Sequence, residues 1–193
     1  MKKNAIILSG LLSIAGLTGF VAEANAGTTV KVNVSGKTRD LVLQYPATIT
    51  TTSKLAPLVM MFHGGSGNAA FFEGQNAELS GLLSKAGYAV AFMDGTGPLD
   101  STKKTWNADH CCSYAFENKI DEAAYIKASV STIASRYSID RSKIFLVGYS
   151  NGGMLDYRVT DKISSTDAAG NSGLVIKGVA IISSAIFKDQ PIP

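Results

Sequence analysis

The hydrophobic positions change their spacing along the chain, and each change marks an expected element. Apolar and polar residues alternate over 30–34, a turn follows at 36–40, and 41–45 returns, which predicts a half-exposed hairpin. Four later segments are rich in consecutive apolar residues, and this pattern is typical of strands buried on both faces. These segments are 58–62, 88–93, 143–147 and 177–182.

Apolar residues recur at helical spacing between these strands. Leu79, Leu82, Leu83 and Ala86 predict one helix, with Asn76 as its cap and Gly87 as its end. A second helix is expected over 123–137, and a third runs to about 163. Strands that alternate with helices predict an α/β fold with three layers (αβα) and a mostly parallel sheet. The 193 residues suffice for one domain with a real core.

The first 26 residues predict a signal peptide. Lys2 and Lys3 precede an apolar stretch over 5–20, and Ala24-Asn25-Ala26 fits the pattern of a cleavage site. The apolar stretch is short for a membrane span. We therefore expect residues 27–193 to form the mature domain, secreted to the periplasm or the extracellular space and free of the membrane after cleavage.

The charge and the cysteine content limit the classes of partner and ligand that the sequence predicts. The formal net charge is +3, and no dense cluster of Lys and Arg is present, which argues against nucleic-acid binding. Cys111 and Cys112 are the only cysteines. Because export favours oxidation and no third cysteine exists, the two are candidates for a disulfide with each other. A metal site would need more ligands than this pair and the nearby His110, so none is expected.

Gly148-Tyr149-Ser150-Asn151-Gly152 carries the candidate chemistry. The segment follows an expected strand and precedes an expected helix, which is the context of a nucleophile elbow. Such a turn strains the serine backbone and exposes its Oγ, and the glycines allow strand and helix to approach closely. Ser150 is therefore the candidate nucleophile; the alternative is an ordinary strand-to-helix turn.

Two further segments are candidates for the same site. His63-Gly64-Gly65-Ser66-Gly67 follows a buried strand, where glycine N–H groups can stabilise an oxyanion; the alternative is a flexible turn. We expect His63 to pack and hold this loop rather than act as a base. Trp106 lies in a long segment without a clear period, and either lines the substrate cleft or packs in the core.

Together these segments resemble the secreted poly(3-hydroxybutyrate) depolymerase and feruloyl/acetylxylan esterase group of the α/β-hydrolases. The resemblance covers about residues 57–184 and rests on His63-Gly64-Gly65, Asp94-Gly95, Trp106-Asn107 with Cys111-Cys112, Ile139-Asp140, and 148–154. It implies hydrolysis of esters of hydroxyalkanoates or of acylated plant polysaccharides, with no cofactor. It also implies an acyl-enzyme on Ser150, and an oxyanion hole made by the N–H groups of Asn151 and Gly65, with Gly64 as the substitute.

The chain differs from this family in the residues that would serve as catalytic acid and base. The fold orders its triad as serine, carboxylate and histidine, whereas both histidines, His63 and His110, precede Ser150. We therefore expect the sequence to be incomplete at its C-terminus, with the last strands missing. The alternatives are a non-catalytic remnant or binding protein with the same fold, and a secreted serine peptidase, since the elbow does not distinguish ester from amide.

Overall fold

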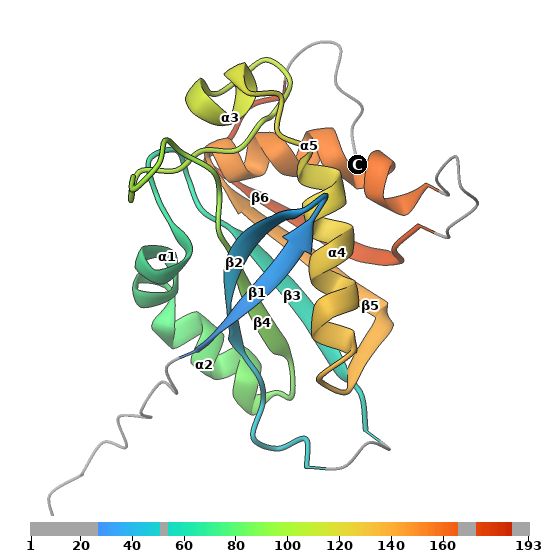
Figure 1. Cartoon of the computed structure of the whole chain (residues 1–193). Helices are drawn as coiled ribbons and strands as arrows, with labels where there is room; N and C mark the ends of the chain where they lie inside the picture. The colour runs from blue at the N-terminus through green and yellow to red at the C-terminus, as the bar shows by residue number, and fades with distance from the viewer. Residues whose placement is uncertain (1–26, 51–53, 166–172, 187–193) are drawn as a thin grey trace, which may run out of the picture.

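The computed structural model describes residues 27–50, 54–165 and 173–186 (Figure 1). The predicted signal peptide lies outside the described residues, as does the end of the sequence at 187–193. The strands are β1 (Thr28–Val34), β2 (Lys37–Gln44), β3 (Ala56–Phe62), β4 (Ala89–Met93), β5 (Ile139–Tyr149) and β6 (Ile176–Ile182). The helices are α1 (Ala69–Gln75), α2 (Ala77–Lys85), α3 (Ser113–Glu117), α4 (Glu122–Ala134) and α5 (Asn151–Ser164).

The strands form one sheet in the order β1-β2-β4-β3-β5-β6. β4, β3, β5 and β6 run parallel to one another, while β1 and β2 form the antiparallel hairpin at one edge. Helices cover both faces, with α4 and α5 on one and α1 and α2 on the other (Figure 1). The predicted α/β fold with a mostly parallel sheet in three layers is confirmed.

Alternation along β3 divides the core between the two faces. Leu58, Met60 and Phe62 pack in the larger cluster, which includes apolar side chains of α4 and α5. Val59 and Met61 point to the opposite face and pack in a smaller cluster with Phe72 of α1. A central strand covered on both faces must be apolar at every position, which explains the uninterrupted hydrophobic run in the sequence.

Several elements differ from the sequence-based expectation: α3 was not predicted, β5 begins at Ile139 rather than at 143, and the hairpin, α1 and β6 differ as follows. The hairpin turn is shorter, since β2 already begins at Lys37. α1 was not predicted, although Asn68 caps it by accepting a hydrogen bond from the N–H of Phe71 at 2.9 Å. β6 is not buried: Ile182 is 47 % exposed, because β6 is the last strand in the order and pairs only with β5 among the described residues.

The carboxyl ends of the central strands meet at one edge of the sheet. Phe62, the last residue of β3, lies beside Met93 of β4 and beside Gly148 near the end of β5. The loops that follow these three strands therefore start next to one another, which is where open α/β sheets place their ligand sites. No helix within the described ranges is long and apolar enough to cross a membrane.

Candidate active site

Ser150 forms a sharp turn between β5 and α5. Its backbone has φ 51° and ψ −116°, a conformation that costs a residue with a side chain about 1–3 kcal/mol. Two contacts from the end of β6 and the residues just after it hold this conformation. The N–H of Ser150 donates to the carbonyl of Ile182 at 2.9 Å, and the hydroxyl of Ser184 donates to the carbonyl of Ser150 at 2.8 Å. The strain predicted for a nucleophile elbow is present.

The glycines at 148 and 152 allow the close approach that this turn needs. A Cβ on Gly152 would collide with the carbonyl oxygen of Phe62 at the end of β3. A Cβ on Gly148 would lie 2.5 Å from the carbonyl group of Gly152. Since both obstacles are backbone atoms that cannot rotate away, any side chain at either position would push the helix off the sheet.

The glycine loop after β3 lies against the elbow. An atom in the Cβ position of Gly64 would be 3.4 Å from the Cβ of Ser150, and one on Gly65 would be 3.8 Å from the Cβ of Asn151. The N–H of Gly65 has no acceptor among the described residues. Asn151 is the first residue of α5, where a backbone N–H has no partner within the helix. The two N–H groups assigned to an oxyanion hole thus belong to neighbouring segments.

The side chain of Asn151 binds the Trp106 segment to the elbow. Its Oδ1 accepts from the N–H of Trp106 at 2.8 Å, and its Nδ2 donates to the carbonyl of Trp106 at 3.2 Å. The indole N–H of Trp106 in turn donates to the carbonyl of His63 at 2.8 Å. Trp106 is 0 % exposed, so it does not line a cleft. Of the two roles considered for it, packing is the one observed.

His63 holds the glycine loop, as expected. The N–H of Gly95 donates to its Nε2 at 3.1 Å, so the ring proton is assigned to Nδ1, which donates to the carbonyl of Gly64 at 2.7 Å. Burial lowers the pKa of His63 below its ordinary value of 6.5. With both nitrogens bound to backbone groups, the neutral ring joins the turn after β4 to the loop after β3.

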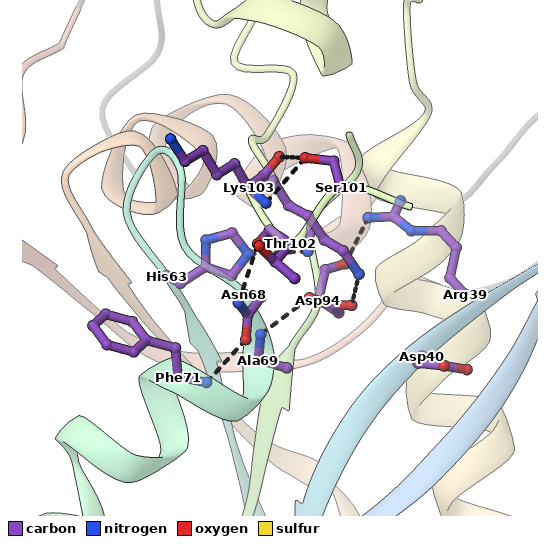
Figure 2. Close-up of polar contacts among 12 residues, drawn as sticks. Arg39, Asp40, His63, Asn68, Ala69, Phe71, Asp94, Ser101, Thr102 and Lys103 are labelled. Atoms are coloured by element: carbon purple, nitrogen blue, oxygen red, sulfur yellow. Dashed lines mark hydrogen bonds and ion pairs between the residues drawn. The ribbon is translucent and has the colours of Figure 1, made fainter. Parts of the chain in front are cut away.

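A buried ion pair supports the turn after β4. Figure 2 shows Arg39 reaching from β2 to the carbonyl of Asp94, which accepts from Nη2 at 3.0 Å. Nη1 of Arg39 lies 2.7 Å from Oε2 of Glu122, at the start of α4. The carboxylate of Asp94 accepts from the N–H of Ala69 at 3.0 Å and pairs with Lys104. Sequence reasoning missed this network, because its members are far apart in the chain.

Cys111 and Cys112 lie directly beside the Trp106 segment. The structure joins the two side chains as a disulfide across a cis peptide bond. The N–H of Cys112 donates to the carbonyl of Trp106 at 3.3 Å. Within the part of the chain that the structure describes, no three His, Cys, Asp or Glu side chains are grouped to hold a metal ion.

Among the residues that the structure describes, no catalytic acid or base is found in contact with Ser150. Among the described residues, no imidazole or carboxylate is hydrogen-bonded to the Oγ of Ser150. His63 is engaged on both nitrogens, as described above. The described residues thus bring together the candidate nucleophile and the candidate oxyanion hole, and place no base at hydrogen-bond distance from Ser150.

The sheet order, the helices on both faces and the elbow after β5 define an α/β-hydrolase. The chain belongs to the family described as serine hydrolase (FSH1), whose profile matches residues 54–192. It is 31 % identical over 121 residues to feruloyl esterase B of Piromyces equi, an alignment that covers 62 % of this chain and 21 % of that relative.

Two solved structures are similar in fold. Est1E from Butyrivibrio proteoclasticus has a TM-score of 0.54 at 16 % identity, over 82 % of this chain and 51 % of that one. FphF, a fluorophosphonate-binding serine hydrolase of Staphylococcus aureus, has a TM-score of 0.50 at 16 % identity. The match covers 82 % of this chain and 58 % of that one. The chain thus spans about a fifth of the curated relative and about half of each structure. The family profile and the feruloyl esterase relative support the esterase part of the resemblance, whereas the two structures, at 16 % identity, show the fold alone. The polyhydroxybutyrate depolymerase subgroup stays a prediction.

Proposed function

We propose that the protein is a secreted carboxylic-ester hydrolase with Ser150 as its nucleophile. The strained backbone of Ser150 carries this proposal, since such strain persists only where surrounding contacts enforce it and is concentrated at functional sites. Here the enforcing contacts come from β6, from Ser184 and from the close approach of Gly148 and Gly152. No other observation distinguishes this turn as sharply from an ordinary strand-to-helix connection.

The reaction proceeds in two halves. The Oγ of Ser150 attacks the carbonyl carbon of the ester while a general base takes its proton, and the alcohol leaves with a proton to give an acyl-enzyme. Water then attacks the same carbon, releases the carboxylic acid and returns the proton to Ser150. The negative charge on the carbonyl oxygen in each half is stabilised by the N–H groups of Asn151 and Gly65, with Gly64 as the alternative donor.

The base and its carboxylate partner are assigned to residues that follow Ser150 in chain order, as the order of the triad in this fold requires. The substrate is an ester of a polymer or oligomer, of the hydroxyalkanoate or acylated polysaccharide type. The name of the relative feruloyl esterase B favours the second type. Export through a signal peptide at 1–26 agrees with a polymer substrate, because external polymers too large to enter a cell must be cleaved outside it.

A covalent probe tests the nucleophile. The protein, expressed with all in-frame codons after residue 193, is treated with a fluorophosphonate that phosphonylates activated serines. We expect labelling of the wild type and none of Ser150→Ala. The matched control is Ser142→Ala, which removes an exposed serine from the same strand, β5, and should label like the wild type. Equal labelling of the wild type and Ser150→Ala would show that another residue is the nucleophile.

A further inference from the structure

Ser184 follows β6 closely and contacts the backbone of the elbow. The chain turns sharply at Ser183, whose φ of 50° lies in the left-handed region that residues with side chains rarely adopt. Directly after this turn, the half-buried Ser184 donates its hydroxyl to the carbonyl of Ser150 at 2.8 Å. The two residues are 34 positions apart in the sequence, so the motif that predicts the elbow does not include Ser184.

The carbonyl oxygen of Ser150 accepts two hydrogen bonds. The N–H of Met154, one turn further along α5, donates to it at 3.0 Å, and the hydroxyl of Ser184 supplies the second bond. Since a carbonyl oxygen has two lone pairs, these two donors use its acceptor capacity fully. One donor belongs to α5 and the other to the segment after β6, so the carbonyl is held relative to both the helix and the sheet.

The peptide unit between Ser150 and Asn151 carries this constraint to the candidate oxyanion hole. The unit is planar and trans, so its C=O and N–H bonds point in opposite directions. One end is the carbonyl that Ser184 binds, and the other end is the N–H of Asn151. Any rotation of the unit that moves the carbonyl away from Ser184 also turns this N–H away from its direction.

Gly153 makes room for Ser184. A Cβ on Gly153 would lie 2.7 Å from the Cβ of Ser184 and 3.0 Å from its Oγ. A side chain at 153 would therefore displace the hydroxyl that binds Ser150. The nucleophile elbow needs its glycines at 148 and 152. Glycine at 153 weakens the helix, and the close contact with Ser184 supplies the physical reason for it.

We propose that Ser184 is a positioning residue for the oxyanion hole, because its hydroxyl sets the direction of the Asn151 N–H through the peptide unit that Ser150 and Asn151 share. The proposal rests on the proposed esterase function and adds a residue outside the elbow to it. Ser184 neither touches the ester nor exchanges a proton. Its contribution is that the donor is already aimed before negative charge develops, which is the condition under which such donors accelerate a reaction.

Hydrolysis rates test this role in the protein expressed with all in-frame codons after residue 193. The substrates are p-nitrophenyl acetate and its thiono analogue, in which sulfur replaces the carbonyl oxygen. Since sulfur accepts hydrogen bonds weakly, the analogue gains little from an oxyanion hole. We expect Ser184→Ala to lower kcat for the oxygen ester by about tenfold with little change in KM, and to slow the thiono ester by less than about threefold.

The matched control is Ser165→Ala. The hydroxyl of Ser165 donates to the carbonyl of Asp161 at 2.7 Å, at the opposite end of the same helix, α5. Its loss removes a bond of the same kind and should leave the kinetic constants of both esters unchanged. An unchanged ratio of oxygen-ester to thiono-ester rates in Ser184→Ala, or an equal fall of this ratio in Ser165→Ala, would overturn the proposal.

The backbone amide of Asn151 gives a second readout that needs no reaction. In an amide NMR spectrum, Ser184→Ala should shift the Asn151 signal, whereas Ser165→Ala should leave it in place. A signal that does not move in Ser184→Ala would overturn the proposal. A failure of the proposed function is seen as absent fluorophosphonate labelling of the wild type, whereas a failure of this inference is seen as a missing difference between Ser184→Ala and the wild type.

Discussion

Asp156 is a buried acid directly behind the elbow. It lies on α5 with no exposed surface, and neither carboxyl oxygen has a hydrogen-bond partner among the described residues. Its Oδ2 would be 2.5 Å from a Cβ on Gly148. Burial without any compensating partner raises the pKa of Asp156 well above its ordinary value of 3.8. Burial therefore favours the neutral form of this carboxyl group in the folded protein.

This raised pKa has a defined effect on stability. Between the ordinary and the raised pKa, the folded state binds a proton that the unfolded state has lost, so stability falls as pH rises through this window. Asp156→Asn removes the titrating carboxyl group, so the stability of this variant should fall less as the pH rises. At alkaline pH its Tm should exceed that of the wild type by roughly 2–4 °C per kcal/mol relieved.

Thermal unfolding from about pH 4 to pH 9 measures this difference. Asp161→Asn is the matched control, because Asp161 is exposed on the same helix. It should follow the wild type at every pH. A wild type whose Tm declines with pH no more steeply than that of Asp156→Asn would contradict the buried neutral acid.

At the scale of elements, two loops and the start of α5 are joined to one another by hydrogen bonds behind the site. The Trp106 indole joins the loop after β3 to the long segment after β4, and the amide of Asn151 joins that segment to α5. Each bond is buried, and one lost partner leaves a buried group unsatisfied at a cost of about 1–3 kcal/mol. The position of the candidate oxyanion loop thus depends on a side chain more than forty residues away.

Trp106→Phe tests this link, since it keeps an aromatic ring in the core and removes the N–H that binds the carbonyl of His63. We expect it to destabilise the protein by about 1–3 kcal/mol, and to slow fluorophosphonate labelling of Ser150 by about tenfold or more. The control is Tyr45→Phe, which removes a hydrogen bond from Tyr45 to the carbonyl of Ser138, remote from the elbow.

Denaturant unfolding and labelling rates are compared for both variants. Tyr45→Phe should lose stability without losing labelling rate. If both variants slow labelling in proportion to their loss of stability, the Trp106 indole acts on the fold as a whole rather than on the oxyanion loop.

At the scale of the whole molecule, the described residues contain the candidate nucleophile and the candidate oxyanion hole, but no general base at hydrogen-bond distance from Ser150. The elbow and the glycine loop adjoin, whereas no base contacts Ser150 within the described ranges. Among the described residues, β6 pairs only with β5 and forms an open edge of the sheet, with Ile182 47 % exposed. An open apolar edge invites pairing with another strand.

Residues 1–193 are therefore compared with a version that continues through all in-frame downstream codons. Loss of the serine's acid and base partners can lower the rate by about 10⁶. We expect the longer version to hydrolyse p-nitrophenyl acetate at least about 10³ times faster. Size-exclusion chromatography reports aggregation in parallel, which we expect to be stronger for residues 1–193. Equal rates for two monomeric proteins would show that the base lies within the first 193 residues.

The sequence alone predicted the fold class, which the structure confirms, and the turn that carries the candidate nucleophile Ser150. Continuous apolar runs identified the central strands, because a strand covered on both faces needs apolar residues throughout. The glycines around Ser150 identified the turn, because local sterics allow no other residue there. The same patterns were misleading for β6, whose apolar residues lie at an open edge.

Only the tertiary structure decided how the site is held. Arg39 and Glu122 are 83 residues apart, and the pair forms because β2 and α4 pack together. The contact of Gly95 with His63, the support of Ser150 by Ser184, and the burial of Trp106 likewise arise from packing between distant segments. The spacing of apolar residues indicates which face of an element is buried, and glycines in a turn indicate the backbone conformation that the turn requires. Neither specifies which remote group a side chain will contact in the folded protein.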